Sequence, residues 1–165
     1  MADFIRVGIL TLSDRASRGE YADKSGVAIA ELLAPLGPQI VEKAIVPDDR
    51  DRIEQTLRAW VVAGSVDLIV TTGGTGLAPR DVTPEATRSV IEREIPGVAE
   101  LMRGEGRKQT PYAVLSRGVA GVAGRTLIVN LPGSEKGVRE SFAPLVELLP
   151  HAVDLIRDTS ADHPA

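Results

Sequence analysis

The sequence predicts an α/β protein, a three-layer sandwich in which helices cover both faces of a mostly parallel central sheet. Short β-rich runs alternate with longer segments whose apolar residues recur at helical spacing. The run at residues 7–12 is almost continuously apolar, which is typical of a strand buried on both faces. Polar, acidic or glycine-rich loops follow the strands, and we expect these loops to meet at one edge of the sheet.

The first half of the chain is expected to supply three strands and two helices. The strands lie at residues 7–12, 39–46 and 67–71, and the helices at residues 26–36 and directly after residues 47–49. Pro35 and the pair Gly37-Pro38 end the first helix. The second helix has an apolar side made of Ile53, Leu57, Trp60 and Val61. Either Asp48 or Asp49 caps its start.

A further helix and strand are expected in the second half. The sequence Thr83-Pro84-Glu85 is typical of a helix start, with Thr83 as N-cap and Pro84 at the first helical position. Residues 125–130 predict a strand that ends in the turn 131–134. The stretch 106–111 is the only long excursion that we expect between elements.

The closing helix is expected over residues 143–156, with a kink or a break at Pro150. Its buried stripe consists of Leu145, Leu148, Leu149, Ala152, Val153 and Ile156. His151 lies within this stripe, so we interpret it as a structural residue.

Length and composition bound the class of protein. The 165 residues favour one domain, expected over residues 1–158 and followed by a flexible tail over 159–165. With 0 Cys and 2 His, thiolate zinc sites, iron–sulfur clusters and a cysteine nucleophile are excluded. A catalytic metal would therefore be a hard cation with oxygen ligands. The net charge of −4 disfavours a nucleic acid as partner.

The N-terminal sequence carries no recognisable targeting signal, since its apolar run is short and is interrupted by Arg6. No stretch approaches the roughly 20 apolar residues of a membrane helix. We therefore expect a cytoplasmic protein without a membrane partner.

The loop Thr72-Gly73-Gly74-Thr75-Gly76 carries the clearest sign of a ligand. Its glycines let the backbone bend tightly and turn successive N–H groups toward one point, as in a nest that binds phosphate. The helix that begins near Pro84 would add the positive end of its dipole. The pattern is neither a Walker loop nor a dinucleotide fingerprint. A glycine-rich turn without a ligand is an equal alternative at this point.

Two acidic loops flank these glycines. Asp81 follows them in the chain, and Asp48 and Asp49 follow the second strand. A single aspartate in such a loop is more often a helix cap than a ligand. Two acidic loops beside a phosphate nest favour a Mg²⁺ site, because carboxylates hold this cation against phosphate oxygens. The residues leave open which of Asp48 and Asp49 is the functional acid.

Other polar residues near turns are weaker candidates. The segment 13–17 is either an ordinary capped turn or an anion site that uses its hydroxyls and Arg15. Ser116, Arg117 and Lys136, taken singly, are typical of solvated surface groups. Together the residues predict a domain that handles a nucleotide or a phosphate with Mg²⁺.

Several motifs occur here in the order that they have in the molybdenum-cofactor biosynthesis family. They are Ser13-Asp14-Arg15-Ala16-Ser17, Pro47-Asp48, Thr-Thr-Gly-Gly-Thr-Gly at 71–76, Arg-Asp-Val-Thr-Pro-Glu-Ala-Thr at 80–87, Leu115-Ser116-Arg117 and Asn130-Leu131-Pro132-Gly133. From about residue 6 to residue 156 the chain resembles the stand-alone bacterial molybdopterin adenylyltransferases and the G domains of gephyrin and its plant homologues. The motifs at 71–76 and 80–85 are highly specific for this family, and the Ser-Asp-Arg opening favours its adenylyltransferase branch.

The resemblance implies a reaction and a set of site residues. Such enzymes use Mg-ATP to transfer AMP onto the terminal phosphate of molybdopterin with release of pyrophosphate. Asp48 and Asp81 match the essential acids, which would hold Mg²⁺ and the triphosphate. The implied nucleotide- and substrate-binding residues are Ser13, Asp14, Thr72, Gly73, Gly74, Thr75, Gly76, Ser116, Arg117, Pro132, Gly133 and Ser134. Members are typically homotrimers, and the molybdenum-insertion enzyme is an expected partner.

Two other functions fit the same resemblance. One is a pterin-binding scaffold without chemistry, against which the intact Asp48 and Asp81 argue. The other is a nucleotide hydrolase like the competence-damage-associated proteins, which usually carry extra domains. The chain departs from many members at Ser134-Glu135-Lys136, where they have a proline two residues after the glycine of the turn. The shape of this loop and the downstream metal, molybdenum or tungsten, are left open.

Overall fold

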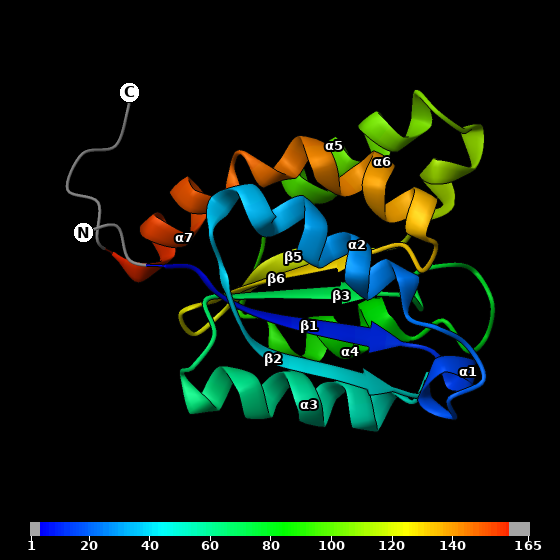
Figure 1. The fold of residues 1–165 in the computed structure, drawn as a ribbon, viewed down its shortest axis with the longest axis horizontal. Coiled ribbons are helices and arrows are strands. Elements are labelled where there is room, and N and C mark those ends of the chain that lie inside the picture. The colour runs from blue at the N-terminus through cyan, green and yellow to red at the C-terminus, as the bar shows by residue number, and fades with distance from the viewer. Residues whose placement is uncertain (1–3, 159–165) are drawn as a thin grey trace.

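A sheet of six strands forms the centre of the computed structural model, which describes residues 4–158 (Figure 1). The strands are β1 (Arg6–Leu12), β2 (Gln39–Val46), β3 (Leu68–Thr72), β4 (Arg93–Glu94), β5 (Ala120–Ala123) and β6 (Thr126–Leu131). They lie in the order β2-β1-β3-β6-β5-β4. The pairs β2–β1, β1–β3 and β3–β6 are parallel, whereas β5 runs antiparallel to both β6 and β4. The expected mostly parallel α/β sandwich is confirmed.

Helices cover both faces of this sheet (Figure 1). They are α1 (Asp14–Ser17), α2 (Lys24–Leu33), α3 (Arg50–Ala63), α4 (Thr83–Val90), α5 (Pro96–Arg107), α6 (Glu135–Val146) and α7 (Leu149–Arg157), with the 3₁₀ helices η1 (Ala34–Leu36) and η2 (Pro111–Leu115). Among residues 4–158, none of these helices combines the length and the apolar character needed to cross a membrane.

The sheet separates two apolar cores, because successive residues of a strand point to opposite faces. On β1, Ile9 packs with α2, α5, α6 and α7, whereas Leu10 packs with α3 and α4. Val70 and Ile69 of β3 divide in the same way between the two cores. Burial on both faces explains why the central strands read as continuous apolar runs.

The sequence missed α5, β4 and β5, and each omission has a physical reason. Helix α5 contains Gly97, Gly104 and Gly106, which lower its helix propensity. The stretch 106–111, expected as a long excursion, instead begins inside α5 and reaches η2 after a short turn. Strand β4 has only 2 residues, and β5 consists of Ala, Gly, Val and Ala, which carry little strand signal.

The closing region breaks into two helices near Pro150, as one of the expected alternatives held. Helix α6 begins well before residue 143, at Glu135, because Ser134 caps it through a hydrogen bond from the Gly137 N–H (2.9 Å). The interpretation of His151 as a structural residue in a buried stripe is wrong, since His151 is exposed on α7. Leu148 is also exposed. The buried residues Leu145, Leu149 and Val153 keep helical spacing across the break. His151 lies two positions from both Leu149 and Val153, so it points to the opposite side of α7, and Leu148 lies in the break itself. The expected tail over 159–165 lies outside the described residues.

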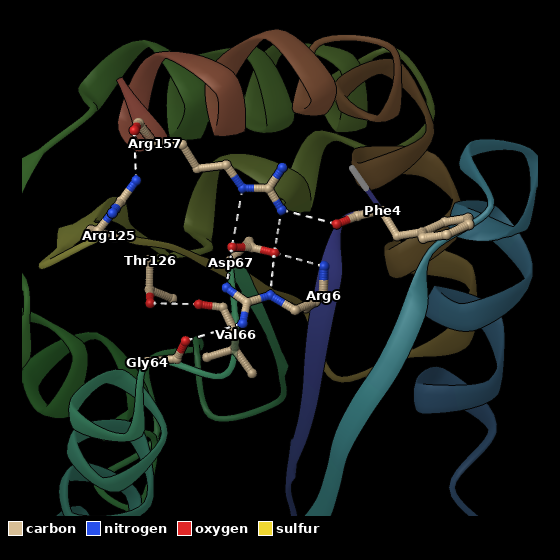
Figure 2. Close-up of polar contacts among 8 residues, drawn as sticks. All are labelled: Phe4, Arg6, Gly64, Val66, Asp67, Arg125, Thr126 and Arg157. Atoms are coloured by element: carbon tan, nitrogen blue, oxygen red, sulfur yellow. Dashed lines mark hydrogen bonds and ion pairs between the residues drawn. The ribbon is translucent and has the colours of Figure 1, made fainter. Parts of the chain in front are cut away.

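Asp67 ties three segments together at the amino edge of the sheet (Figure 2). Its side chain is only 3% exposed and accepts hydrogen bonds from the backbone N–H of Arg6 (2.8 Å) and from the guanidinium groups of Arg6 (2.8 Å) and Arg157 (3.2 Å). Arg157 also donates to the carbonyl of Phe4 (2.9 Å). Burial alone would raise the pKa of Asp67, but the hydrogen bonds from the two arginines outweigh it and hold the pKa well below its usual range.

We expect Asp67→Asn to lower the free energy of unfolding at pH 7 by about 2–4 kcal/mol, because it leaves two arginines without their shared charge. Since the folded-state pKa is lowered, this stabilisation is present above the ordinary carboxyl pKa of about 3.9 and is lost as the pH falls below it. Urea unfolding at pH 7 and pH 3 should show the difference between the two proteins narrowing at pH 3. An equal difference at both pH values would contradict this.

Candidate functional site

The loops after β1, β2, β3 and β6 meet at the carboxyl edge of the sheet, as parallel strands require. The Ser13 N–H donates to the carbonyl of Val46 (2.9 Å), which joins the ends of β1 and β2. The Gly73 N–H donates to the carbonyl of Leu131 (3.1 Å), and the Thr72 hydroxyl donates to that of Pro132 (2.6 Å). The four loops that were expected to converge therefore do so.

The glycine loop passes so close to its neighbours that side chains are excluded at two positions. Gly73 and Gly74 have φ of +103° and +67°. A Cβ on Gly73 would stand 2.3 Å from the carbonyl oxygen of Leu12, and one on Gly74 would stand 2.3 Å from the hydroxyl of Thr83. Both are far below van der Waals contact, so glycine is required here.

Thr83 holds the start of α4 against this loop. Its hydroxyl donates to the carbonyl of Gly73 (2.9 Å), and its N–H donates to that of Gly74 (3.1 Å). The expectation that Thr83 caps α4 is thereby corrected, since Val82 occupies the N-cap position and Thr83 is the first helical residue. The Thr83 hydroxyl bonds the glycine loop and does not cap the helix. Because the helix begins at Thr83, Pro84 is its second residue.

The structure separates the two adjacent acids that follow β2. Asp49 caps α3 by accepting a hydrogen bond from the Arg52 N–H (3.0 Å). Asp48 faces the glycine loop, with its Oδ1 3.2 Å from the point where a Cβ on Gly74 would stand. This Oδ1 is buried and has no hydrogen-bond partner among the described residues. Asp48 is therefore the acid of this pair that is available to a ligand.

Asp48 and Asp14 are joined by two hydrogen bonds, in each of which the backbone N–H of one residue donates to the carboxylate of the other. The Asp48 N–H donates to Asp14 Oδ1 (3.0 Å), and the Asp14 N–H donates to Asp48 Oδ2 (3.3 Å). Arg80 clamps Asp14 with two hydrogen bonds of 2.6 and 2.8 Å. Burial raises the pKa of Asp48, and the negative charges of Asp14 and Asp81 add to this effect.

Asp81 approaches the same loop from its other end. Its Oδ2 accepts a hydrogen bond from the Ala78 N–H (2.9 Å) and lies 2.8 Å from the point where a Cβ on Gly76 would stand. Within residues 4–158 no three His, Asp or Glu side chains form a group that would hold a metal by themselves. Two carboxylates beside a phosphate nest are nevertheless the usual protein share of a Mg²⁺ site, in which phosphates and waters supply the other ligands.

A cleft of about 640 Å³ opens beside the glycine loop, between it and α5, η2 and α6. Of the residues implied by the family resemblance, those that line it are Gly74, Thr75, Gly76, Asp81, Ser116, Pro132, Gly133 and Ser134. Those that do not line it are Ser13, Asp14, Asp48, Thr72, Gly73 and Arg117. Ser13 caps α1 by accepting from the Ala16 N–H (3.1 Å), and Arg117 is bonded to protein groups behind the cleft wall.

Sequence reasoning missed the opposite wall of the cleft. It includes Ala99, Met102, Arg103 and Gly106 of α5, Thr110, Tyr112, Ala113 and Leu115 in and beside η2, and Glu140 and Ser141 of α6. Half of these residues are small or apolar and are equally typical of a core, and the polar ones are typical of a solvated surface when taken singly. No pattern in the sequence therefore marks them as a site. These residues form a wall only because the fold places α5 and η2 opposite the glycine loop.

A family model described as "Probable molybdopterin binding domain" matches residues 8–151 of the chain. The chain belongs to this family. The resemblance drawn from the motifs is thereby confirmed.

Known members of the molybdopterin-binding family resemble this chain over most of its length. A molybdopterin adenylyltransferase of Helicobacter pylori J99 is 47% identical over 154 residues, which cover 92% of this chain and 88% of that protein. The molybdenum cofactor synthesis protein cinnamon of Drosophila melanogaster is 49% identical over 93% of this chain, which spans only 26% of that longer protein. The crystal structure of the molybdopterin biosynthesis enzyme MoaB from Thermus thermophilus superposes with a TM-score of 0.89 at 53% identity, covering 96% of this chain and 100% of that one.

We expect Gly73→Ala to destabilise the fold by about 3 kcal/mol, because the new methyl group would meet the backbone of β1 at a positive φ. Gly19→Ala is the matched control, since Gly19 also has a positive φ (+73°) but nothing within 4 Å of an added Cβ. It should cost only about 1 kcal/mol. Urea unfolding measures both values, and equal losses would contradict the close approach at Gly73.

We expect Asp48→Asn to stabilise the fold slightly at pH 7, by about 0.5 kcal/mol after allowance for solvent screening. The raised pKa means that the charged carboxylate is less favourable in the folded state, so this cost grows as the pH rises through the folded-state pKa. Asp49→Asn is the control, because Asn also caps helices well. Thermal unfolding at pH 7 should give a higher midpoint for Asp48→Asn only, and a lower midpoint would refute this account.

Proposed function

We propose that this chain is a molybdopterin adenylyltransferase that uses Mg-ATP in molybdenum cofactor biosynthesis. The observation that carries the proposal is the approach of Asp48 and Asp81 to the glycine loop from two sides, at the edge of a cleft. Relatives that bear this name, from Helicobacter pylori and Escherichia coli, are 47% and 45% identical to the chain. The two acids and the loop supply what transfer of a nucleotidyl group needs, which is alignment and neutralisation of phosphate charge.

In the proposed reaction an oxygen of the molybdopterin phosphate attacks the α-phosphorus of ATP. The bond from the α-phosphorus to the oxygen that bridges to the β-phosphorus breaks, and pyrophosphate leaves with the bonding electron pair. The Gly73 N–H is engaged by the carbonyl of Leu131, and the backbone N–H groups of residues 74–76 are suited to hold phosphate oxygens. The start of α4 adds its dipole. The cleft beside the loop has room for the pterin.

The residues fit a divalent cation. Asp48 presents a buried carboxylate oxygen that has no hydrogen-bond partner within residues 4–158, and Asp81 is the second carboxylate on the loop. When bound, Mg²⁺ supplies charge neutralisation and alignment of the phosphate oxygens. Asp14 would keep Asp48 oriented toward the loop through the two hydrogen bonds between these residues, and Arg80 would hold Asp14 in place.

Further properties are proposed from the family resemblance. They are one domain over residues 1–158, a cytoplasmic location, a homotrimeric assembly and the molybdenum-insertion enzyme as a partner. Sedimentation equilibrium tests the assembly, and a monomer at micromolar concentration would contradict the trimer.

The proposed function is tested by pyrophosphate release from Mg-ATP, with and without molybdopterin. Release that depends on molybdopterin is the expected result. Release without the pterin would instead indicate a nucleotide hydrolase. No release from a folded protein that still binds the pterin would indicate a scaffold.

Asp81→Asn and Asp48→Asn are each expected to lower this molybdopterin-dependent release at least 100-fold, because each removes a proposed Mg²⁺ ligand. Asp49→Asn should keep the wild-type rate, since Asp49 caps α3. The measurement is the initial rate at saturating Mg-ATP, with circular dichroism to show that each variant is folded. Full activity in Asp81→Asn would exclude its metal role.

A further inference from the structure

Arg117 makes hydrogen bonds to the segment that carries Asp81. It directly follows Ser116, which lines the cleft. Its Nε donates to the carbonyl of Gly76 (2.8 Å), and its Nη2 donates to the carbonyl of Asp81 (2.6 Å). Its own N–H donates to the carbonyl of Thr75 (2.8 Å). One side chain therefore joins the two ends of the loop 76–81, where the glycine loop stops and Asp81 begins.

Other contacts hold this loop at its margins. Arg80 bonds the carboxylate of Asp14, and Thr83 bonds the glycine loop. Residues 77–80 are exposed, so hydrophobic burial contributes little to holding them. Within the loop, the Asp81 N–H donates to the Ala78 carbonyl (2.9 Å), and the Ala78 N–H donates to the Asp81 carboxylate (2.9 Å). These local bonds form a small turn, but they do not set where that turn lies relative to the glycines. The guanidinium of Arg117 bonds the carbonyls of both Gly76 and Asp81, and so fixes the two ends of the loop to each other.

Glu85 holds the guanidinium in place from the first turn of α4. Its carboxylate accepts a hydrogen bond from Nη1 of Arg117, so all three guanidinium nitrogens of Arg117 have protein partners. Although burial opposes it, the hydrogen bond from Arg117 lowers the pKa of Glu85 and keeps it charged. Glu85 thus connects the Arg117 side chain, and through it Asp81, to helix α4, which packs in the same core as Leu10.

Arg103 of α5 holds the other side of this arrangement. It lines the cleft, and its Nη1 donates to the carbonyls of Ser116 (3.2 Å) and Gly118 (3.0 Å), the residues on either side of Arg117. The backbone at Arg117 is therefore fixed by the cleft wall. A continuous chain of hydrogen bonds leads from that wall through Arg117 to the backbone of Asp81.

We propose that Arg117 is a positioning residue for Asp81 and not an anion ligand of the substrate, with Glu85 and Arg103 as its supports. The inference rests on the proposed function, because it assigns a purpose to the place of Asp81. It replaces the substrate-binding role that the family resemblance implied for Arg117. A guanidinium suits this task because its planar fork reaches several acceptors at fixed angles, which a lysine ammonium does not.

Arg117→Lys separates the two roles, since it keeps the charge and loses the fork. If Arg117 positions Asp81, kcat for pyrophosphate release should fall about 10–100-fold, while KM for Mg-ATP and for molybdopterin changes less than about threefold. Arg88→Lys is the matched control, because Arg88 is an exposed arginine of the same helix as Glu85 and should be silent. A KM raised tenfold or more, with kcat restored at saturation, would show a direct substrate ligand and overturn the proposal.

A second readout does not depend on activity. Hydrogen–deuterium exchange of the peptide over residues 75–84 should be at least tenfold faster in Arg117→Lys, while exchange in β1 is unchanged. If Arg117→Lys loosens the whole fold, Glu85→Gln decides, since it keeps the size of the side chain and removes only its charge. Unchanged exchange of this peptide in that variant would overturn the inference.

The two proposals fail in different ways. If the wild-type protein releases no pyrophosphate, the adenylyltransferase function fails, yet the exchange experiment still decides whether Arg117 holds the loop. If the wild type is active and Arg117→Lys keeps both its kcat and its exchange pattern, only the positioning role is refuted.

Discussion

At Gly73 the chain leaves β3 and crosses the end of β1 so closely that no side chain fits between Gly73 and the carbonyl of Leu12. The positions of the glycine loop, the start of α4 and the Asp48 carboxylate all depend on this crossing. It lets Gly74 lie against Thr83, which brings the first turn of α4 to the loop, and it leaves space beside Gly74 for the Asp48 carboxylate. A bulkier residue would push β3 away from β1 and open the sheet between two buried strands.

Behind this edge, buried polar residues keep the central strands and α4 in register. Asn130 of β6 donates to the hydroxyls of Thr71 on β3 and Thr87 on α4, both at 3.0 Å, and accepts from the Val119 N–H (3.2 Å). A fully satisfied buried amide of this kind is specific about geometry, because any displacement leaves a polar group without a partner. The glycine loop therefore rests on a rigid base, whereas the loop 76–81 beyond it is exposed and is held by the hydrogen bonds of two arginines, Arg80 and Arg117.

The sequence allowed the central strands, the paired acids and the glycine loop to be predicted, because each has a local signature. The cleft wall from α5 and η2 could not be predicted, since its glycines and small apolar residues look like weak core. His151 was misjudged because it stands among apolar residues in the chain, although helical spacing places it opposite Leu149 and Val153. The grip of Arg117 on Gly76 and Asp81 joins residues far apart in the chain, and no local pattern in a single sequence reports such pairs.

The contacts of Arg157 with Phe4 and Asp67 have a consequence for the folding of the chain during synthesis. Phe4 and Arg157 are 153 positions apart, so this contact forms only after nearly the whole described chain has left the ribosome. Until then Asp67 has the guanidinium of Arg6 as a partner but lacks the hydrogen bonds from Arg157. Forming this contact closes a loop of nearly the whole described chain, at an entropic cost that rises only slowly with loop length. A chain that ends before α7 would lack both contacts of Arg157, and its first strand would begin without this tie to the end of the chain.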